Sequence, residues 1–335
     1  MKRHLTEHLA ELAFPPLADA VARGEGFEVI VAGVAVRWCQ TSPPAEDEGV
    51  AVWELAQVGG HLRAGVVLQT DPDLHAGSYQ VTLTNAGDSP VVMDAVHPLV
   101  VRFPGVGGPW RVLRARGGTT ENFYPPRAYS PAERVVFGGE VRIESPPGGR
   151  SSDRHLPLLL ATAGAEPGAA GVFAGMAYSG EWFLTLRHVG DGPFLRGRLK
   201  ASGVVLAPGE TLALPAAHVG FFDGGLSAGT NALRRYLTRR VCPKLGSEAM
   251  VPPVSYNHWF GIRNDFDEPL LRRQVARAAE LGVEYWVHGP GWFEGGLPGG
   301  VGNWRRADPA RYPHGLESLA ECVRSAGMQF GLWLE

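Results

Sequence analysis

The sequence predicts an all-β sandwich followed by the beginning of a parallel β/α arrangement. From about residue 26 to 220, short β-rich runs alternate with Gly, Pro, Asp and Asn clusters, and helical periodicity is nearly absent. A helical pattern first appears at residues 226–237, and strand and helix patterns alternate after Pro253. The chain has 335 residues, which is enough for two cores.

The β-rich part shows period-two alternation most clearly at residues 79–84, with similar runs at 27–32 and 134–137. Turn-forming clusters at 85–88 and 190–193 separate such runs. Many short strands at this spacing favour a sandwich over residues 1–225, and a barrel with open loops is the alternative.

Residues 226–250 are expected to form a linker helix and a connector. Leu233 and Leu237 share one helix face, and Thr230 or Asn231 is a candidate cap at the helix start. The run Val251-Pro252-Pro253 then ends the connector, because consecutive prolines cannot continue a helix.

Residues 251–335 predict strand, helix, strand, helix and strand in turn. The expected strands are 254–259, 283–287 and 328–334. Asp267 is a candidate cap and Gly282 a candidate terminator of the first helix, and Leu319 and Val323 lie on one stripe of the second. A glycine-rich loop covers roughly 288–313.

This order predicts an incomplete (β/α)8 TIM-type barrel of about three strands and two helices. A complete barrel needs about 250 residues, whereas about 85 follow the connector. We therefore expect either that the natural protein continues past Glu335 or that the segment is the remnant of a barrel.

Composition excludes several classes of function. A formal net charge of −3 predicts no nucleic-acid partner and no anionic membrane surface as partner. The three cysteines are far apart, which predicts neither a disulfide framework nor a metal site, and no phosphate-binding loop motif indicates a nucleotide cofactor. Without an apolar leader or a long apolar run, a cytoplasmic location is expected.

Aromatic and polar residues gather at the expected carboxyl ends of the three strands, where β/α barrels bind ligands. The end of the first strand carries Asn257, His258 and Trp259, that of the second His288 and Trp292, and that of the third Trp333 and Glu335. Indole faces pack on the C–H faces of sugar rings, and amide, imidazole and carboxylate groups bind hydroxyls. The pattern indicates a sugar site; alternatively, these aromatics only fill the barrel mouth.

These residues also carry a resemblance to a known family. The matching pieces are Asn257-x-Trp259, Phe266-Asp267-Glu268, Ala279-Glu280-Leu281-Gly282, Gly291-Trp292-Phe293, Gly302-Asn303-Trp304, Asp308-Pro309, Tyr312-Pro313-x-Gly315-Leu316 and Gly327-Met328-x-Phe330-Gly331-Leu332-Trp333-Leu334-Glu335. In order and spacing they resemble the opening of the catalytic barrel of α-galactosidases in glycoside hydrolase family 36. The runs Gly149-Arg150-Ser151-Ser152, His155-Leu156-Pro157 and Ala177-Tyr178-Ser179-Gly180-Glu181-Trp182 resemble that family's N-terminal β-supersandwich.

The resemblance implies a retaining mechanism in which one aspartate is the nucleophile and a second the acid and base. In the family these lie on the fourth and sixth barrel strands, so both are expected beyond residue 335 and no catalytic residue is assigned here. The expected substrate is an oligosaccharide or glycoside, and family members often form homo-oligomers. The substrate-binding candidates are Asn257, Trp259, His288, Trp292, Asn303, Trp304, Trp333 and Glu335, with Arg150, Tyr178 and Trp182 as contacts from the sandwich.

The chain departs from the family pattern at the second strand end. Gly289 and Pro290 stand where members usually carry acidic residues that bind hydroxyls of the terminal galactose, and Asn303 stands where Asp is frequent. Three hypotheses stay open: a glycosidase with this or another sugar specificity, a non-catalytic sugar-binding protein, and an inactive fragment with an exposed barrel edge.

Overall fold

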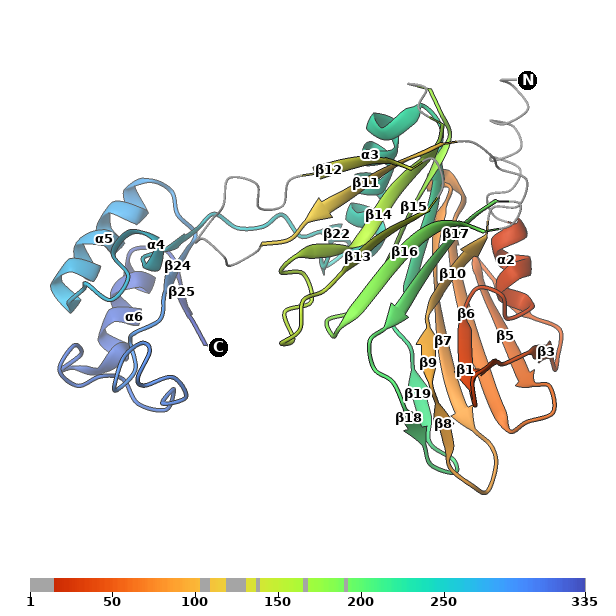
Figure 1. Cartoon of the computed structure of the whole chain (residues 1–335). Helices are drawn as coiled ribbons and strands as arrows, with labels where there is room; N and C mark the ends of the chain where they lie inside the picture. The colour runs from red at the N-terminus through yellow and green to blue at the C-terminus, as the bar shows by residue number, and fades with distance from the viewer. Residues whose placement is uncertain are drawn as a thin grey trace. The chain divides into compact units, whose positions relative to one another are not determined.

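The structure is a computed structural model that describes residues 15–102, 109–118, 131–136, 139–164, 168–189 and 192–334. The chain forms two compact units, Met1–Cys242 and Pro243–Glu335 (Figure 1). None of the helices described is both long enough and apolar enough to cross a membrane.

The first unit is built from antiparallel sheets. In the largest, the strand order is β12-β11-β14-β15-β20-β7-β6-β5-β3, with β19 also pairing with β7 and β4 with β5. Its strands are β3 (Trp38–Gln40), β4 (Ala45–Asp47), β5 (Val50–Gln57), β6 (Leu62–Asp71), β7 (Ala76–Asn85), β11 (Trp110–Arg116), β12 (Pro131–Val136), β14 (His155–Ala163), β15 (Gly171–Met176), β19 (Thr211–Ala213) and β20 (Ala217–Phe222).

A four-stranded sheet, in the order β10-β17-β16-β13, lies against the largest sheet (Figure 1). Its strands are β10 (Leu99–Arg102), β13 (Glu140–Glu144), β16 (Trp182–Val189) and β17 (Gly192–Leu199). Two smaller sheets, β2-β1-β9 and β18-β8, complete the unit. Their strands are β1 (Glu28–Val31), β2 (Val34–Ala35), β8 (Val91–Met93), β9 (Ala95–His97) and β18 (Val204–Leu206).

The core of the first unit lies between these layers. Leu83 and Leu159 from the largest sheet and Leu184 and Leu195 from the four-stranded sheet belong to one buried apolar cluster. Along β7, buried and more exposed residues alternate, as period-two side-chain direction requires. The prediction of a mostly β N-terminal domain is confirmed.

The first unit has few helices among the residues described, most of them near the two ends of its sequence. They are α2 (Pro15–Ala22), the 3-10 turn η1 (Pro72–Leu74), α3 (Gly225–Tyr236) and the π-helical turn η2 (Leu237–Val241). Helix α3 packs through Tyr236 against Phe173 and Phe222, whose side chains point away from the main core. The expected cap was wrong: Thr230 lies inside α3, where its hydroxyl donates to the Leu226 carbonyl at 2.7 Å.

The second unit contains a parallel three-stranded sheet in the order β23-β24-β25. Its strands are β21 (Lys244–Leu245) and β22 (Glu248–Ala249), which form a hairpin, and β23 (Ser255–Asn257), β24 (Tyr285–His288) and β25 (Gln329–Leu332). Its helices are α4 (Trp259–Ile262), α5 (Glu268–Glu280) and α6 (Gly315–Ser325). Helix α5 therefore connects β23 to β24 in sequence, and α6 follows the long loop and leads to β25.

Local sequence signals set the ends of α5 as predicted. The Asp267 carboxylate accepts a hydrogen bond from the Leu270 amide at 2.7 Å, which caps the helix start. Gly282 follows the helix with φ 74°, in the left-handed region that a glycine adopts without strain. Leu271 and Val275 of α5 pack with Leu319 of α6 in one buried cluster.

The first parallel strand is shorter than predicted. It ends at Asn257, whose side-chain oxygen accepts a hydrogen bond from the Trp259 amide at 2.9 Å. This bond directs the chain into the short helix α4, so Trp259 starts a helix instead of ending a strand.

Candidate functional site

Three of the predicted site residues of the second unit lie at the carboxyl ends of its parallel strands. Asn257 is the last residue of β23, His288 is the last residue of β24, and Trp333 directly follows β25. Parallel strands bring their carboxyl ends to one edge of a sheet, so three segments far apart in sequence meet there. Glu335 lies outside the described residues.

The ends of β23 and β24 approach each other closely at Gly289. A methyl group on Gly289 would lie 2.7 Å from Trp259 Cβ and 2.8 Å from Asn257 Oδ1, closer than real side-chain contacts allow. Asn257 and Trp259 are each half-buried, whereas Gly289 and Pro290 are buried. This position has no room for any side chain in the structure, an acidic one included.

A buried polar chain runs behind these strand ends. His258 Nε2 lies 2.8 Å from His288 Nδ1, and His288 Nε2 contacts the Tyr312 hydroxyl. His288 Nδ1 also lies 2.9 Å from the Gly289 carbonyl oxygen. Burial lowers the pKa of His258 to about 4 and that of His288 to about 3, and it raises the pKa of Tyr312. All three groups are therefore uncharged at neutral pH.

His288 was predicted to contact substrate, but its side chain has no exposed surface. It faces His258, Tyr312 and the rings of Phe266 and Trp286 instead of solvent. In this structure His288 can affect ligand binding only indirectly, by fixing the positions of the residues that it contacts.

The tryptophans of this region differ in exposure. Trp292 is 2% exposed, and its indole N–H donates to the Trp333 carbonyl oxygen at 2.9 Å. Trp304 and Trp333 are partly buried and pack against the same apolar cluster. Trp259, Trp304 and Trp333 therefore keep some exposed surface, whereas Trp292 joins the loop to the end of β25.

The loop from Gly289 to Arg311 closes on itself at its base. The Glu294 amide donates to the Arg306 carbonyl at 3.0 Å, and the Asp308 amide donates to the Trp292 carbonyl at 2.9 Å. Asn303 is exposed, and its side-chain amide donates to the Glu294 carbonyl at 3.0 Å, so its side-chain oxygen stays available to a hydroxyl.

Carboxylates in this loop have structural partners. Glu294 forms an ion pair with Arg306 at 3.4 Å, and Asp308 accepts a hydrogen bond from the Ala310 amide at 2.9 Å, as a turn former does. We assign no pair of carboxylates among the described residues to acid–base chemistry. The described side chains also form no cluster of His, Cys, Asp or Glu that could hold a metal ion.

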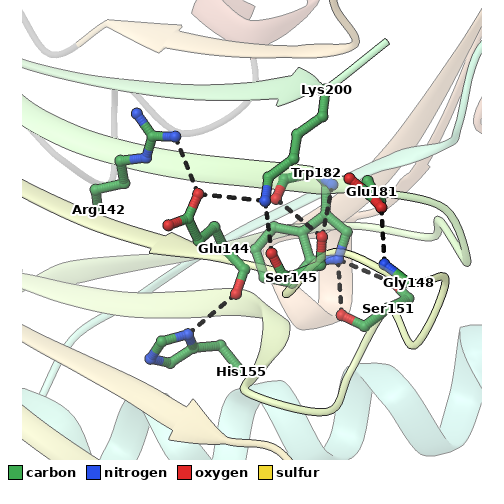
Figure 2. Close-up of polar contacts among 9 residues, drawn as sticks. All are labelled: Arg142, Glu144, Ser145, Gly148, Ser151, His155, Glu181, Trp182 and Lys200. Carbon is green, nitrogen blue, oxygen red and sulfur yellow. Dashed lines mark hydrogen bonds and ion pairs between the residues drawn. The ribbon is translucent and has the colours of Figure 1, made fainter.

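The sandwich candidates Arg150, Tyr178 and Trp182 lie in the first unit. Figure 2 shows Trp182 beside the segment 145–155, with its indole N–H donating to the Ser151 hydroxyl at 2.9 Å and to the Ser151 carbonyl at 3.1 Å. Trp182 has no exposed surface. It is an anchor of this loop, and direct contact with a sugar is excluded while the loop keeps this position.

Other bonds hold the same loop in place (Figure 2). Glu181 accepts from the Gly148 amide at 3.1 Å, and the Ser151 hydroxyl donates to the Tyr178 carbonyl at 2.7 Å. Lys200 donates to the Ser145 carbonyl at 2.6 Å. Arg150 is exposed and lies on this loop, which the bonds above hold in a defined position. Tyr178 is partly buried.

Sequence reasoning did not select His258 or Tyr312 as site residues. His258 lies near the end of the predicted strand 254–259, beside the selected Asn257 and Trp259, and this position is the available signal. Tyr312 is 24 residues from its partner His288, and no local pattern indicates such a pairing.

Comparisons with known proteins agree with the resemblance found in the sequence. A family model described as melibiase matches residues 211–335. A probable α-galactosidase C of Aspergillus terreus is 27% identical over 301 residues, which cover 84% of this chain and 38% of that protein. The α-galactosidase AgaA of Geobacillus stearothermophilus is 32% identical over 133 residues, which cover 39% of this chain and 18% of that protein.

Solved structures show the same fold. The galactosidase domain of the α-galactosidase–sucrose kinase AgaSK superposes with a TM-score of 0.76 at 20% identity, covering 92% of this chain and 45% of that one. The family 36 α-galactosidase AgaA of Geobacillus stearothermophilus gives a TM-score of 0.73, also at 20% identity, over 92% of this chain and 45% of that one. The chain spans less than half the length of these proteins. In sequence and in fold, it resembles the α-galactosidases of glycoside hydrolase family 36.

Proposed function

We propose that this chain is part of a glycoside hydrolase that acts on α-galactosides or closely related α-glycosides. It supplies the N-terminal β-supersandwich and the first three strands of a (β/α)8 barrel, with residues 226–250 as the linker. The observation that carries the proposal is the similarity to α-galactosidases over 84% of the chain. The parallel order of β23, β24 and β25 is the expected start of such a barrel.

The proposed substrate site lies at the carboxyl ends of these strands. Asn257 and Asn303 offer amide groups to sugar hydroxyls, and Trp259, Trp304 and Trp333 offer ring surface. Structures of AgaA variants have been solved with raffinose and with stachyose, which supports an oligosaccharide as ligand. The nucleophile and the acid–base carboxylate are proposed to lie on the fourth and sixth strands, beyond residue 335.

The test is hydrolysis of an aryl α-galactoside by the full gene product and by the isolated 335-residue chain. We expect the full product to cleave it, to leave the matching β-galactoside intact, and to retain the anomeric configuration. The isolated chain is expected to cleave neither, because it carries no assigned carboxylate pair.

A second candidate is sugar binding without hydrolysis, which the close packing at Gly289 favours because it leaves no acidic side chain at that strand end. Titration of tryptophan fluorescence with galactose and raffinose separates the two. Saturable binding by a full product that releases no aglycone would contradict hydrolysis and support this candidate.

A further inference from the structure

The His258–His288–Tyr312 chain connects three segments that are distant in sequence. His258 follows β23, His288 ends β24, and Tyr312 lies just after the loop 289–311. The imidazole of His288 has several hydrogen-bond partners. Its Nδ1 lies 2.8 Å from His258 Nε2 and 2.9 Å from the Gly289 carbonyl oxygen. The chain therefore ties the far end of the loop to the strand ends at which the loop begins.

The direction of the hydrogen bonds follows from which groups can donate. The Gly289 carbonyl can only accept, so His288 Nδ1 carries the proton. Because this histidine is neutral, its Nε2 must then accept, and the Tyr312 hydroxyl is the donor. His258 Nε2 accepts from the same Nδ1–H. Only one tautomer of His288 satisfies all of these contacts.

The three side chains are buried, so losing one of these hydrogen bonds is costly. His258 and His288 have no exposed surface, and Tyr312 is 2% exposed. The ring of Phe266 lies 4.8 Å from that of His258 and 5.3 Å from that of His288, at steep angles. Water does not reach this enclosure, so a nitrogen that loses its partner there stays unsatisfied.

This anchor is one of several ties of the loop, since the Asn264 side-chain amide donates to the Leu297 carbonyl at 3.0 Å and the Arg311 guanidinium donates to the Asn264 carbonyl at 3.0 Å. The start of the loop is bonded to the end of β25 through Trp292, and its base is closed by the bonds between residues 292–294 and 306–308. Beyond the base, Tyr312 is the group that joins the returning chain to β24. Asn303 and Trp304 lie on the loop between these ties.

We propose that His258, His288 and Tyr312 are positioning residues that fix the loop 289–311 at the strand ends. Through that loop they set the positions of Asn303 and Trp304, which makes His288 a support of the site instead of a ligand for sugar. The effect on sugar binding rests on the proposed function, whereas the effect on the loop does not.

The test compares Tyr312→Phe with Tyr256→Phe in the full 335-residue chain. Tyr312→Phe removes the hydroxyl, keeps the ring and leaves His288 Nε2 without a donor. Tyr256→Phe is the matched control, because it removes a hydroxyl that donates to Gln274 at 3.0 Å in the same unit but outside the network.

Loop opening is measured as the rate of tryptic cleavage after Arg305 and Arg306, both exposed on the loop, with cleavage after Arg273 and Arg277 of α5 as reference. Tyr312→Phe is expected to raise the loop rate about five- to thirtyfold, the factor for one unsatisfied buried acceptor. The reference sites and the control variant should change less than about twofold. An unchanged loop rate, or an equal rise at all four sites, would overturn the proposal.

A second measurement addresses the site itself. In the full gene product, Tyr312→Phe is expected to raise KM for an aryl α-galactoside about five- to thirtyfold with kcat changed less, because the loop carries binding groups. The same fall in kcat for both variants, with KM unchanged, would contradict a positioning role. If the full product has no activity, the proposed function fails, while the proteolysis result still decides whether the network holds the loop.

Discussion

Gly289 lies where the end of β24 meets the segment that follows β23. A methyl group at this position would lie 2.7 Å from Trp259 Cβ and 2.8 Å from Asn257 Oδ1. Of these two atoms, Trp259 Cβ is bonded directly to the backbone and cannot move away by side-chain rotation. Gly289 is not a positive-φ residue, so steric contact alone decides the effect of a substitution. The residue is thus required by packing, independently of any turn.

Gly289→Ala is expected to destabilise the second unit by about 1–3 kcal/mol, the usual cost of forcing an added carbon into a packed site. Urea unfolding followed by circular dichroism measures this as a lower midpoint with an unchanged slope.

Gly261→Ala is the matched control for this change. Gly261 lies in α4, has no positive φ, and a methyl group there would meet nothing within 4 Å. It should be neutral or stabilise by up to about 1 kcal/mol, since alanine favours a helix more than glycine does. If both substitutions change the free energy of unfolding equally, Gly289 is not packed closely against Trp259 and Asn257.

At the level of elements, the start of β16 holds the loop 145–154 of the first unit. The Ser151 hydroxyl both donates to the Tyr178 carbonyl at 2.7 Å and accepts from the Trp182 indole at 2.9 Å. Ser151→Ala removes both bonds with little loss of volume. We expect a loss of about 1 kcal/mol in unfolding free energy and faster tryptic cleavage after Arg150 and Arg154.

Ser152→Ala provides the comparison, because Ser152 is exposed and belongs to the same loop. Its effect should stay within about 0.5 kcal/mol, as for most surface substitutions. If Ser152→Ala loosens the loop as much as Ser151→Ala, the bonds to Tyr178 and Trp182 do not hold it.

Elements with local signals could be predicted from the sequence. Asp267 and Gly282 set the ends of α5 because an N-cap carboxylate and a left-handed glycine act within one helical turn. The cap of α3 was predicted wrongly, because Gly224, with φ 93°, precedes the helix without a side-chain cap bond, and Thr230 bonds back to Leu226 instead.

The sequence indicates the strand ends that form the candidate site, but it does not indicate whether the side chains there are exposed. Aromatic residues at strand ends indicate the region, yet whether Trp182 or His288 faces solvent depends on partners elsewhere in the chain. Ser151 is 31 residues from Trp182, and Tyr312 is 24 from His288. Such pairings arise from tertiary packing, which no single-sequence periodicity encodes.

At the scale of the whole molecule, two units with separate apolar clusters predict cleavage in the segment that joins them in sequence. Leu245 is 78% exposed and Val251 84% exposed. Brief trypsin treatment is expected to cut after Lys244 early and to leave a fragment that ends near this residue, detected by mass spectrometry.

The substitution Lys244→Gln should remove this cut and leave the other sites unchanged. Survival of an intact 335-residue chain under conditions that cut an unstructured substrate would contradict an exposed junction. If trypsin degrades the first unit as fast as it degrades the whole chain, the first unit is not stable by itself.

The contact at Gly289 has a consequence for protein engineering. Because one of the crowding atoms is Trp259 Cβ, replacing Trp259 by anything other than glycine leaves the obstruction, and changing Asn257 removes only part of it. A larger residue at position 289 therefore requires either that α4 shift or that both Trp259 and Asn257 be replaced. Redesign of the proposed sugar site at this edge therefore calls for exchange of residues 257–262 together with 289–290 as one block, since these positions are in contact and their substitutions are coupled.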